Sequence, residues 1–188
     1  MSVEVLASPK SAAQRIFVEV PTPFESQLVF RAEFRDPFEV AAPTGLRFQL
    51  CRGPMSYLGM ANRLQRLVGQ LGTWKALLKL VTPRRVFYVV SDEVQILHHG
   101  WLTVGHCRHY HVGPRDVVVG PIWTSAAARG RGVATFATRM AINEMIRDGH
   151  YVFYIDTACT NAPCLRVIDK CRFGPPLATY VRIESVRT

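Results

Sequence analysis

The stretch from Val117 to Asn143, VVVGPIWTSAAARGRGVATFATRMAIN, decides the fold. An apolar run of strand length leads into small residues, then two glycines that each follow an arginine, and then a helical pattern. The first N–H groups of a helix have no acceptor within the helix, and the helix dipole adds positive partial charge there. A strand, a glycine-rich loop and a helix in this order therefore predict an anion site.

The loop itself has the composition of a phosphate or pyrophosphate site. Gly130 and Gly132 let an anion approach the main chain with no Cβ in the way, and Arg129 and Arg131 supply full positive charges. The loop has neither the Gly-Lys-Ser/Thr of nucleoside-triphosphate loops nor the three-glycine spacing of dinucleotide folds. A plain surface turn between strand and helix is the alternative interpretation.

This loop resembles the Arg/Gln-x-x-Gly-x-Gly/Ala loop of the GNAT superfamily of N-acetyltransferases. The matching residues are Arg129, Gly132 and Ala134. The short phrase in residues 119–124, Val-Gly-Pro-x-Trp-Thr, with His98 near Trp101, is also similar to a subset of bacterial GNAT proteins linked to surface polysaccharide synthesis.

A second motif downstream strengthens the resemblance. Asn161, Cys164, Lys170 and Phe173 follow the spacing of the superfamily's Asn-x-x-Ser/Ala and Lys-x-Gly-Phe motifs, with Arg172 in place of the glycine. The two motifs occur in the right order, with a predicted helix and strand between them. The resemblance covers roughly residues 46–180.

The resemblance implies a fold and a domain arrangement. The fold is α/β (α+β), with a mixed, mostly antiparallel central sheet that is flanked by helices and splayed between its two central parallel strands. We expect the acyltransferase domain at residues 46–188 and an N-terminal extension with short strands at residues 1–45.

The resemblance also implies the cofactor and its contacts. Acetyl-CoA would be the co-substrate, and its acetyl group would pass to the amine of a small acceptor, such as an amino sugar, by direct attack in a ternary complex. Backbone N–H groups near residues 122–124 are the candidates for holding the pantetheine and the thioester carbonyl. The expected coenzyme-binding residues are Ile122, Trp123, Thr124, Arg129, Gly130, Arg131, Gly132, Val133, Ala134, Thr135, Asn161, Cys164 and Lys170.

Pro121 lies inside the predicted strand 117–124. Proline cannot donate to a sheet ladder, so it indicates either an edge strand or a bulge. A bulge on a central strand would separate it from its neighbour. In the GNAT fold, the pantetheine arm inserts at such a separation.

Histidines in an apolar strand are the first candidates for a general base. His98 and His99 titrate near neutral pH when unperturbed, and as neighbours on a strand only one of them can face a cleft. A structural role is the alternative for either residue. Glu93 and Asp116 at strand ends come next.

The superfamily often uses a tyrosine seven residues after the asparagine as its general acid. Ile168 stands there, so the leaving thiolate would take its proton from water, Cys164 or Tyr154. This departure leaves a non-catalytic acyl-CoA-binding or regulatory domain open as an alternative function.

The histidine-rich segment before the central strand contains His106, Cys107, His109 and His111. Their spacing matches no standard zinc pattern, so we expect no metal.

The remaining pattern predicts further elements. Between residues 57 and 80 we expect two helices broken at Gly69 and Gly72, whose apolar stripe packs into the core or caps the acceptor pocket. That stripe consists of Leu64, Leu67, Val68 and Leu71.

A helix at 131–147 would expose a narrow polar stripe, which consists of Arg139, Asn143 and Arg147. We expect a helix at 161–171 and strands at 15–20, 27–34, 46–51, 85–90, 94–104, 151–156 and 179–186. The first two strands fit either a hairpin added to the sheet or an arm on a second subunit, so a homodimer is compatible with them.

Composition bounds the class of protein. The chain has 188 residues, 48% hydrophobic and 20% charged, with a net charge of +9. Its basic residues are scattered, which favours a phosphorylated ligand, although a nucleic-acid-binding protein stays open as a third function. Five cysteines at irregular positions do not predict disulfides, and no apolar run is long enough to span a membrane. We expect a cytoplasmic protein that does not bind nucleic acid.

Overall fold

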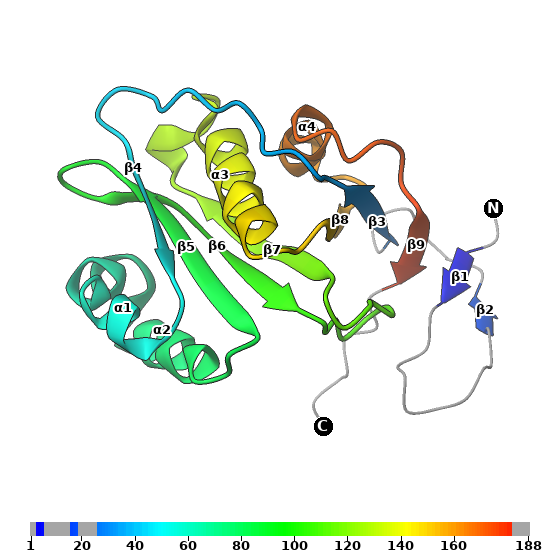
Figure 1. Ribbon diagram of the computed structural model, residues 1–188, viewed down its shortest axis with the longest axis horizontal. Helices are drawn as coiled ribbons and strands as arrows, with labels where there is room; N and C mark the ends of the chain where they lie inside the picture. The colour runs from blue at the N-terminus through cyan, green and yellow to red at the C-terminus, as the bar shows by residue number, and fades with distance from the viewer. Residues whose placement is uncertain (1–2, 6–15, 19–25, 182–188) are drawn as a thin grey trace.

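The computed structural model describes residues 3–5, 16–18 and 26–181 (Figure 1). Its main sheet has seven strands in the order β4-β5-β6-β7-β8-β3-β9, and only the β7–β8 pair is parallel. The strands are β3 (Ser26–Glu33), β4 (Arg47–Cys51), β5 (Arg85–Ser91), β6 (Ile96–Val104), β7 (Val117–Thr124), β8 (Val152–Ala158) and β9 (Ala178–Val181). The predicted mixed, mostly antiparallel sheet is confirmed.

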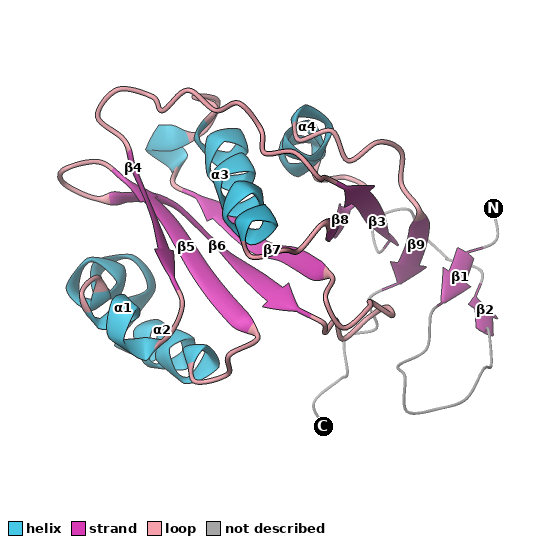
Figure 2. Ribbon diagram, in the orientation of Figure 1, coloured by secondary structure: helices cyan, strands magenta, loops and turns pink. Residues whose placement is uncertain are grey.

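Helices cover both faces of this sheet (Figure 2). The helices α1 (Pro54–Leu58) and α2 (Ala61–Leu80) pack on β4, β5 and β6 from one face. On the other face, α3 (Val133–Arg147) crosses β4 to β7, and α4 (Ala162–Lys170) packs on β8 beside α3. A 3-10 turn, η1 (Ala126–Ala128), lies between β7 and α3.

Strand β5 shows why this sheet needs two helical layers. Val86, Tyr88 and Val90 belong to the core beneath α3, whereas Phe87 and Val89 belong to the core beneath α1 and α2. All are buried, so β5 has a nearly continuous apolar sequence in place of the alternation of a half-exposed strand.

The parallel strands β7 and β8 separate after a short ladder. They pair only at Val117–Val119 with Phe153–Ile155, although both strands continue beyond these residues. Next to the divergence, Trp101 of β6 faces two residues of β7, Gly120 and Pro121, because the β6–β7 register shifts there. The predicted bulge and splay are thus present, and β7 has neighbours on both sides, so it is not an edge strand.

Strand β3 lies within the main sheet although the sequence placed it in an extension. It pairs with β8 on one side and with β9 on the other. Its partner is not the segment around residues 15–20, where β2 (Ile16–Val18) pairs with β1 (Val3–Val5) in a separate two-stranded sheet. The predicted last strand is described only to residue 181, and its remainder lies outside the described residues.

The expected apolar stripe of α2 is only partly buried. Leu64 is buried, but Leu71 is 77% exposed, so its predicted burial is wrong. The cause is Gly69, whose φ of 71° and ψ of 172° interrupt the helix and rotate its second half. Gly72, the second expected break, lies in regular helix. The side chains of residues 67 and 68 lie outside the described set.

The polar stripe expected on α3 is wrong at Asn143, which is buried with 4% exposure, whereas Arg147 is exposed as expected. The chain between β3 and β4 runs over α3 (Figure 1). Its Phe38 N–H donates to Asn143 Oδ1 at 2.7 Å, and Asn143 Nδ2 donates to the Phe38 carbonyl at 2.9 Å. Arg139 lies over the Phe38 ring and donates to the carbonyl of Lys170 at 2.6 Å. A long-range contact therefore covers a face that a lone helix would expose.

Candidate active site

A cleft of about 1150 Å³ runs from the N-terminus of α3 into the divergence of β7 and β8. The expected coenzyme-binding residues line it, with the exception of Arg131. Residues from the opposite face of the sheet line it too, among them Trp101, Thr103 and Asp156. The cleft thus joins the glycine-rich loop to the side of the sheet on which α2 packs.

The loop end of the cleft presents unpaired main-chain donors. Gly130 and Gly132 have φ values of 75° and 74°, a conformation that favours glycine, and Gly132 is the N-cap of α3. In the part of the chain that the structure describes, no protein acceptor takes a hydrogen bond from the N–H groups of Gly130, Gly132, Val133, Ala134 or Thr135. These amides, at the positive end of α3 and beside Arg129, form a site suited to phosphate oxygens.

The divergence of the strands supplies a second set of contacts. Beyond Val119, the edge of β7 that faces β8 has no ladder partner among the described residues. The other edge of β7 stays paired with β6 at Ile122, Trp123 and Thr124. A strand edge of this kind can pair with an extended ligand that carries amide groups.

Asp156 on β8 is the carboxylate of the cleft. Among the described residues that line the cleft it is the sole Asp or Glu. Its Oδ1 accepts from the Tyr110 hydroxyl at 3.2 Å, and its Oδ2 accepts from the Tyr180 hydroxyl at 2.6 Å. Burial, and then the charge of Asp156, raise the pKa of Tyr110 far above its ordinary value. The Tyr110 phenol therefore stays protonated and holds the carboxylate in place.

His98 and His99, the expected catalytic residues, do not line the cleft. His98 is fully buried, and its Nδ1 lies 2.8 Å from Thr124 Oγ1. Burial and, to a lesser extent, the neighbouring His99 lower the pKa of His98 to about 3. His99 stacks on Trp123 with 5.3 Å between ring centroids, and burial lowers its pKa to about 4. Both rings are neutral near pH 7 and contact residues that do line the cleft, Thr124 and Trp123.

The two acidic alternatives also lie away from the cleft. Glu93 is exposed in the turn between β5 and β6. Asp116 lies just before β7, where its Oδ2 accepts the Gly113 N–H at 2.8 Å. Neither residue lines the cleft.

Asn161 and Cys164 of the second motif lie at the start of α4, and Lys170 is the last residue of the helix. Asn161 is the N-cap of the helix, and its Oδ1 accepts the Cys164 N–H at 3.3 Å. Cys164 lines the cleft, and burial raises the pKa of its thiol, so the sulfur is protonated at neutral pH. Ile168 is 1% exposed in the core, at the place where the superfamily's tyrosine would stand. The side chain of Tyr154 does not line the cleft and packs on Tyr110.

The histidine-rich segment borders the cleft without forming a metal centre in the described region. His106, Cys107 and His109 line the cleft, but His111 does not. The ring of His109 stacks on Tyr180 with 5.1 Å between centroids. No group of three or more His, Cys, Asp or Glu side chains within the described ranges could hold a metal ion.

Asp156, which lines the cleft, and the two tyrosines that are hydrogen-bonded to it are the candidate site residues that sequence reasoning missed. Asp156 comes at the end of an apolar strand that is parallel to its neighbour, and ligands bind beyond the carboxyl ends of such strands. That position was a usable signal. No local pattern pointed to Tyr110 or Tyr180, because 46 and 24 positions of chain separate them from Asp156.

Comparisons with known proteins agree with this geometry. The sequence model described as "Acetyltransferase (GNAT) family" matches residues 72–173, whereas no curated protein sequence matches the chain. A tandem GNAT protein from the clavulanic acid biosynthesis pathway has a TM-score of 0.63 and 15% identity over 96% of this chain, which spans 61% of that protein's length. The aminoglycoside acetyltransferase AAC(6')-Iy, solved with a bisubstrate analog of CoA, has a TM-score of 0.56 and 13% identity over 76% of this chain and 97% of its own. A predicted acetyltransferase with acetyl-CoA from Clostridium acetobutylicum has a TM-score of 0.51 and 14% identity over 74% of this chain and 96% of its own.

At these identities the structural neighbours show the fold. The sequence model, by contrast, covers more than half of the 188 residues and includes the loop, the splayed strands and the second motif. The chain therefore belongs to the GNAT acetyltransferase family.

Proposed function

We propose that the protein is an acetyl-CoA-dependent N-acetyltransferase that acts on a small amine, such as an amino sugar, by direct attack in a ternary complex. One observation carries the proposal. The cleft connects free loop amides on one face of the sheet, through the divergence of β7 and β8, to the Asp156 carboxylate on the other face. A phosphate-bearing acyl carrier and an amine acceptor can thus enter from opposite faces and meet between the strands.

The loop and strand β7 would hold the coenzyme. Its pyrophosphate would accept hydrogen bonds from the amides of residues 130–135, and its pantetheine arm would pair with the free edge of β7. The thioester carbonyl would then lie near Ile122–Thr124, whose main-chain N–H groups are the candidates for stabilising the oxyanion.

Asp156 is our candidate for the proton acceptor. The neutral amine attacks the thioester carbon, the carbonyl π electrons move onto oxygen, and the amine proton passes to the carboxylate. As the tetrahedral intermediate collapses, the C–S bond breaks and the departing thiolate takes a proton. The thiol of Cys164 is the protein donor lining the cleft, and water is the other source. His98 and His99 then act as positioning residues for Thr124 and Trp123.

We also infer that the enzyme works in the cytoplasm, because its five cysteines, at irregular positions in the sequence, do not have the pattern of a disulfide framework. Within the described residues, no helix has the length and apolarity needed to span a bilayer.

Coenzyme binding is tested by thermal unfolding with and without CoA. A ligand present at about 100 times its Kd stabilises a protein by about 2.7 kcal/mol, so CoA should raise the melting temperature by several degrees. Gly132→Glu places a carboxylate among the phosphate-binding amides and should abolish the shift. Gly174→Glu is the matched control, since Gly174 also has a positive φ of 75° and open surroundings but lies outside the cleft. A shift that survives Gly132→Glu would exclude the loop as the site.

Catalysis is tested by thiol release from acetyl-CoA across amino sugars, amino acids, polyamines and peptides. Asp156→Asn should lower kcat by at least 100-fold while the CoA-induced melting shift persists, because general-base catalysis contributes typically 10²- to 10⁴-fold. Asp169→Asn on the exposed surface of α4 is the control. A protein that binds CoA yet releases no thiol with any amine would instead be the non-catalytic acyl-CoA-binding domain, which Ile168 at the tyrosine position favours.

A further inference from the structure

We propose that the acceptor carries an anionic group, a phosphate or a carboxylate, which binds in a basic pocket at the end of the cleft opposite the glycine-rich loop. The identity of this ligand as the acceptor rests on the proposed function. The site itself rests on the side chains that line the pocket.

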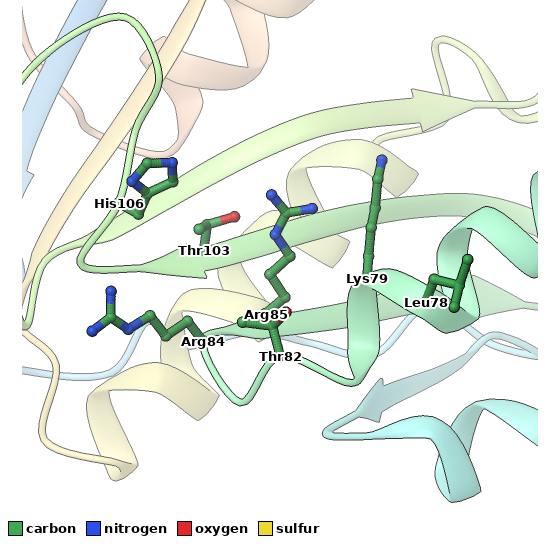
Figure 3. Close-up of a pocket in the computed structure, with 7 residues that line it drawn as sticks. All are labelled: Leu78, Lys79, Thr82, Arg84, Arg85, Thr103 and His106. Atoms are coloured by element: carbon green, nitrogen blue, oxygen red, sulfur yellow. The ribbon is translucent and has the colours of Figure 1, made fainter. Parts of the chain in front are cut away.

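The pocket has a volume of about 410 Å³ and is formed by the end of α2, the start of β5 and the end of β6 (Figure 3). Figure 3 shows Lys79 and Arg85 extending in the same direction from neighbouring elements, with Thr103 beside Arg85 and His106 in the loop after β6. Arg84 completes the set of cationic side chains. Guanidinium and ammonium groups together with a threonine hydroxyl match the oxygens of a phosphate or carboxylate.

No carboxylate in the described part of the chain neutralises these cations. No Asp or Glu occurs in the sequence between Glu39 and Asp92, so every charged side chain in that segment is a Lys or Arg. The ion pairs of the described residues are Arg35–Glu33, Arg52–Asp148 and Arg147–Glu144, and none includes a cation of the pocket. Lys79 Nζ instead lies over the ring of Trp101, 5.4 Å from its centroid. Several like charges close together without counter-charges are stabilised when an anion binds.

The pocket opens into the cleft on the face of the sheet that carries Asp156. Lys79, Arg85, Thr103 and His106 line both the pocket and the cleft. Arg85 pairs with Thr103, Thr103 with Val118, and Val118 with Tyr154, which precedes Asp156 by two residues on β8. Directly paired residues point to the same face, so Arg85 and Asp156 share one.

The strand spacing sets the size of the acceptor. Strands lie about 4.8 Å apart, so the backbones of Arg85 and Asp156 are separated by roughly 15 Å before their side chains extend toward each other. A small molecule with an amine at Asp156 and an anionic group one sugar ring away can span the remaining gap.

The coenzyme's pyrophosphate is not the anion that these cations would hold. The pairing of Arg85 through Thr103 places it level with Val118, near the start of β7. The glycine-rich loop follows Thr124 at the other end of that strand, and the six residue steps from Val118 to Thr124 span roughly 20 Å.

The charges also disfavour polycationic acceptors. AAC(6')-Iy is described as an aminoglycoside acetyltransferase, and aminoglycosides carry several amino groups. In this chain, the side of the cleft proposed to hold the acceptor is lined by three cations, Lys79, Arg85 and Arg108, and, among the described residues, by one carboxylate, that of Asp156. Two or more ammonium groups would meet repulsion there, whereas one amine paired with one anion would not.

The first test is calorimetric titration of the CoA-free and the CoA-saturated protein with matched probes. One pair is glucosamine 6-phosphate and glucosamine, and the other is β-alanine and β-alaninamide. The first pair tests for binding of a phosphate, and the second tests for binding of a carboxylate. We expect the member that carries the phosphate or carboxylate to bind at least tenfold more tightly, in at least one pair, than the partner that lacks this group. The double variant Arg84→Gln/Arg85→Gln should remove that preference. Arg47→Gln/Arg63→Gln removes the same two charges from exposed sites of the acid-free segment outside the pocket and should preserve it.

The proposal is overturned if neither probe with an anionic group binds better than its partner without that group, or if the Arg84/Arg85 double variant keeps the preference. Because this readout needs no turnover, it is independent of the test of acetyl transfer. With turnover, the double variant should raise KM for the anionic acceptor at least tenfold and leave KM for acetyl-CoA unchanged. An unchanged acceptor KM in a variant that has lost the anion would show that the pocket is not the acceptor site.

Discussion

Gly100 on β6 is paired with Tyr88 on β5 and lies against its buried ring. A Cβ at residue 100 would lie 2.4 Å from Cζ and Oη of Tyr88, and both residues are buried. Gly100→Ala should therefore lower the free energy of unfolding by about 1–3 kcal/mol, as for other overpacked cores. Urea denaturation measures the change. Gly59→Ala is the control, because Gly59 has a helical φ of −59° and the nearest atom to a Cβ added there would be 3.9 Å away. Equal stability of the two variants would contradict the close packing.

His98 makes the stability of the protein depend on pH. Its pKa is lowered to about 3 in the folded state, against about 6.5 for an unperturbed histidine. Between these values the unfolded chain binds a proton that the folded chain does not, so the free energy of unfolding should decrease as pH falls from about 6.5. The slope attributable to His98 is about 1.4 kcal/mol per pH unit, and it levels off near pH 3.

The variant His98→Gln isolates this contribution from that of the carboxylates. The free energy of unfolding is measured by urea denaturation from pH 4 to 8. Below pH 6 it should change less steeply with pH in the variant than in the unmodified protein. Above pH 7, where the histidine is neutral in both the folded and the unfolded state, the two curves should be parallel. Parallel curves across the whole range would mean that His98 is not buried in its neutral form.

At the scale of elements, the segment between β3 and β4 is hydrogen-bonded to α3 through the side chain of Asn143. Asn143 is buried and makes two hydrogen bonds with the main chain of Phe38. Asn143→Ala leaves the Phe38 N–H and C=O without these partners, so we expect a loss of about 2–4 kcal/mol and a melting temperature lower by several degrees. Asn62→Ala on the exposed surface of α2 is the matched control. A melting temperature equal to that of the control would show that the segment does not depend on Asn143.

Local patterns in the sequence predicted those structural elements whose conformation is determined by residues close together in the chain. The glycine-rich loop, the helix after it and the bulge at Pro121 follow from residues a few positions apart. Contacts between distant segments were not predictable in the same way. Asn143 was expected in solvent because its partner, Phe38, is 105 positions away. His98 was a candidate base because its burial beneath α3 depends on packing that no local pattern shows.

At the scale of the whole molecule, the sheet consists of two parts joined by the short β7–β8 ladder. One part is β4 to β7, and the other is β8, β3 and β9. A chain that begins at residue 46 would keep every element from β4 onward but lose β3, which is the partner of β8 on one edge and of β9 on the other. We expect such a chain not to unfold cooperatively and to aggregate, because both strands would present open edges.

Circular dichroism melting and dispersion of the amide NMR signals, compared with those of the full chain, would measure this loss. A cooperatively folded chain from residue 46 would establish residues 46–188 as an independent domain, as the sequence predicted. Failure to fold would show that the segment before residue 46 is part of the GNAT domain.

The position of β3 also has a consequence during synthesis. Val29 of β3 pairs with Asp156 of β8, which is synthesised 127 positions later. In a nascent chain, β3 therefore stays without its partner strands until β8 and β9 have been synthesised, and the second part of the sheet can assemble only then. The side of the cleft that includes Asp156 is thus completed only after β8 and β9 have been synthesised, and a polypeptide interrupted before β8 would lack it.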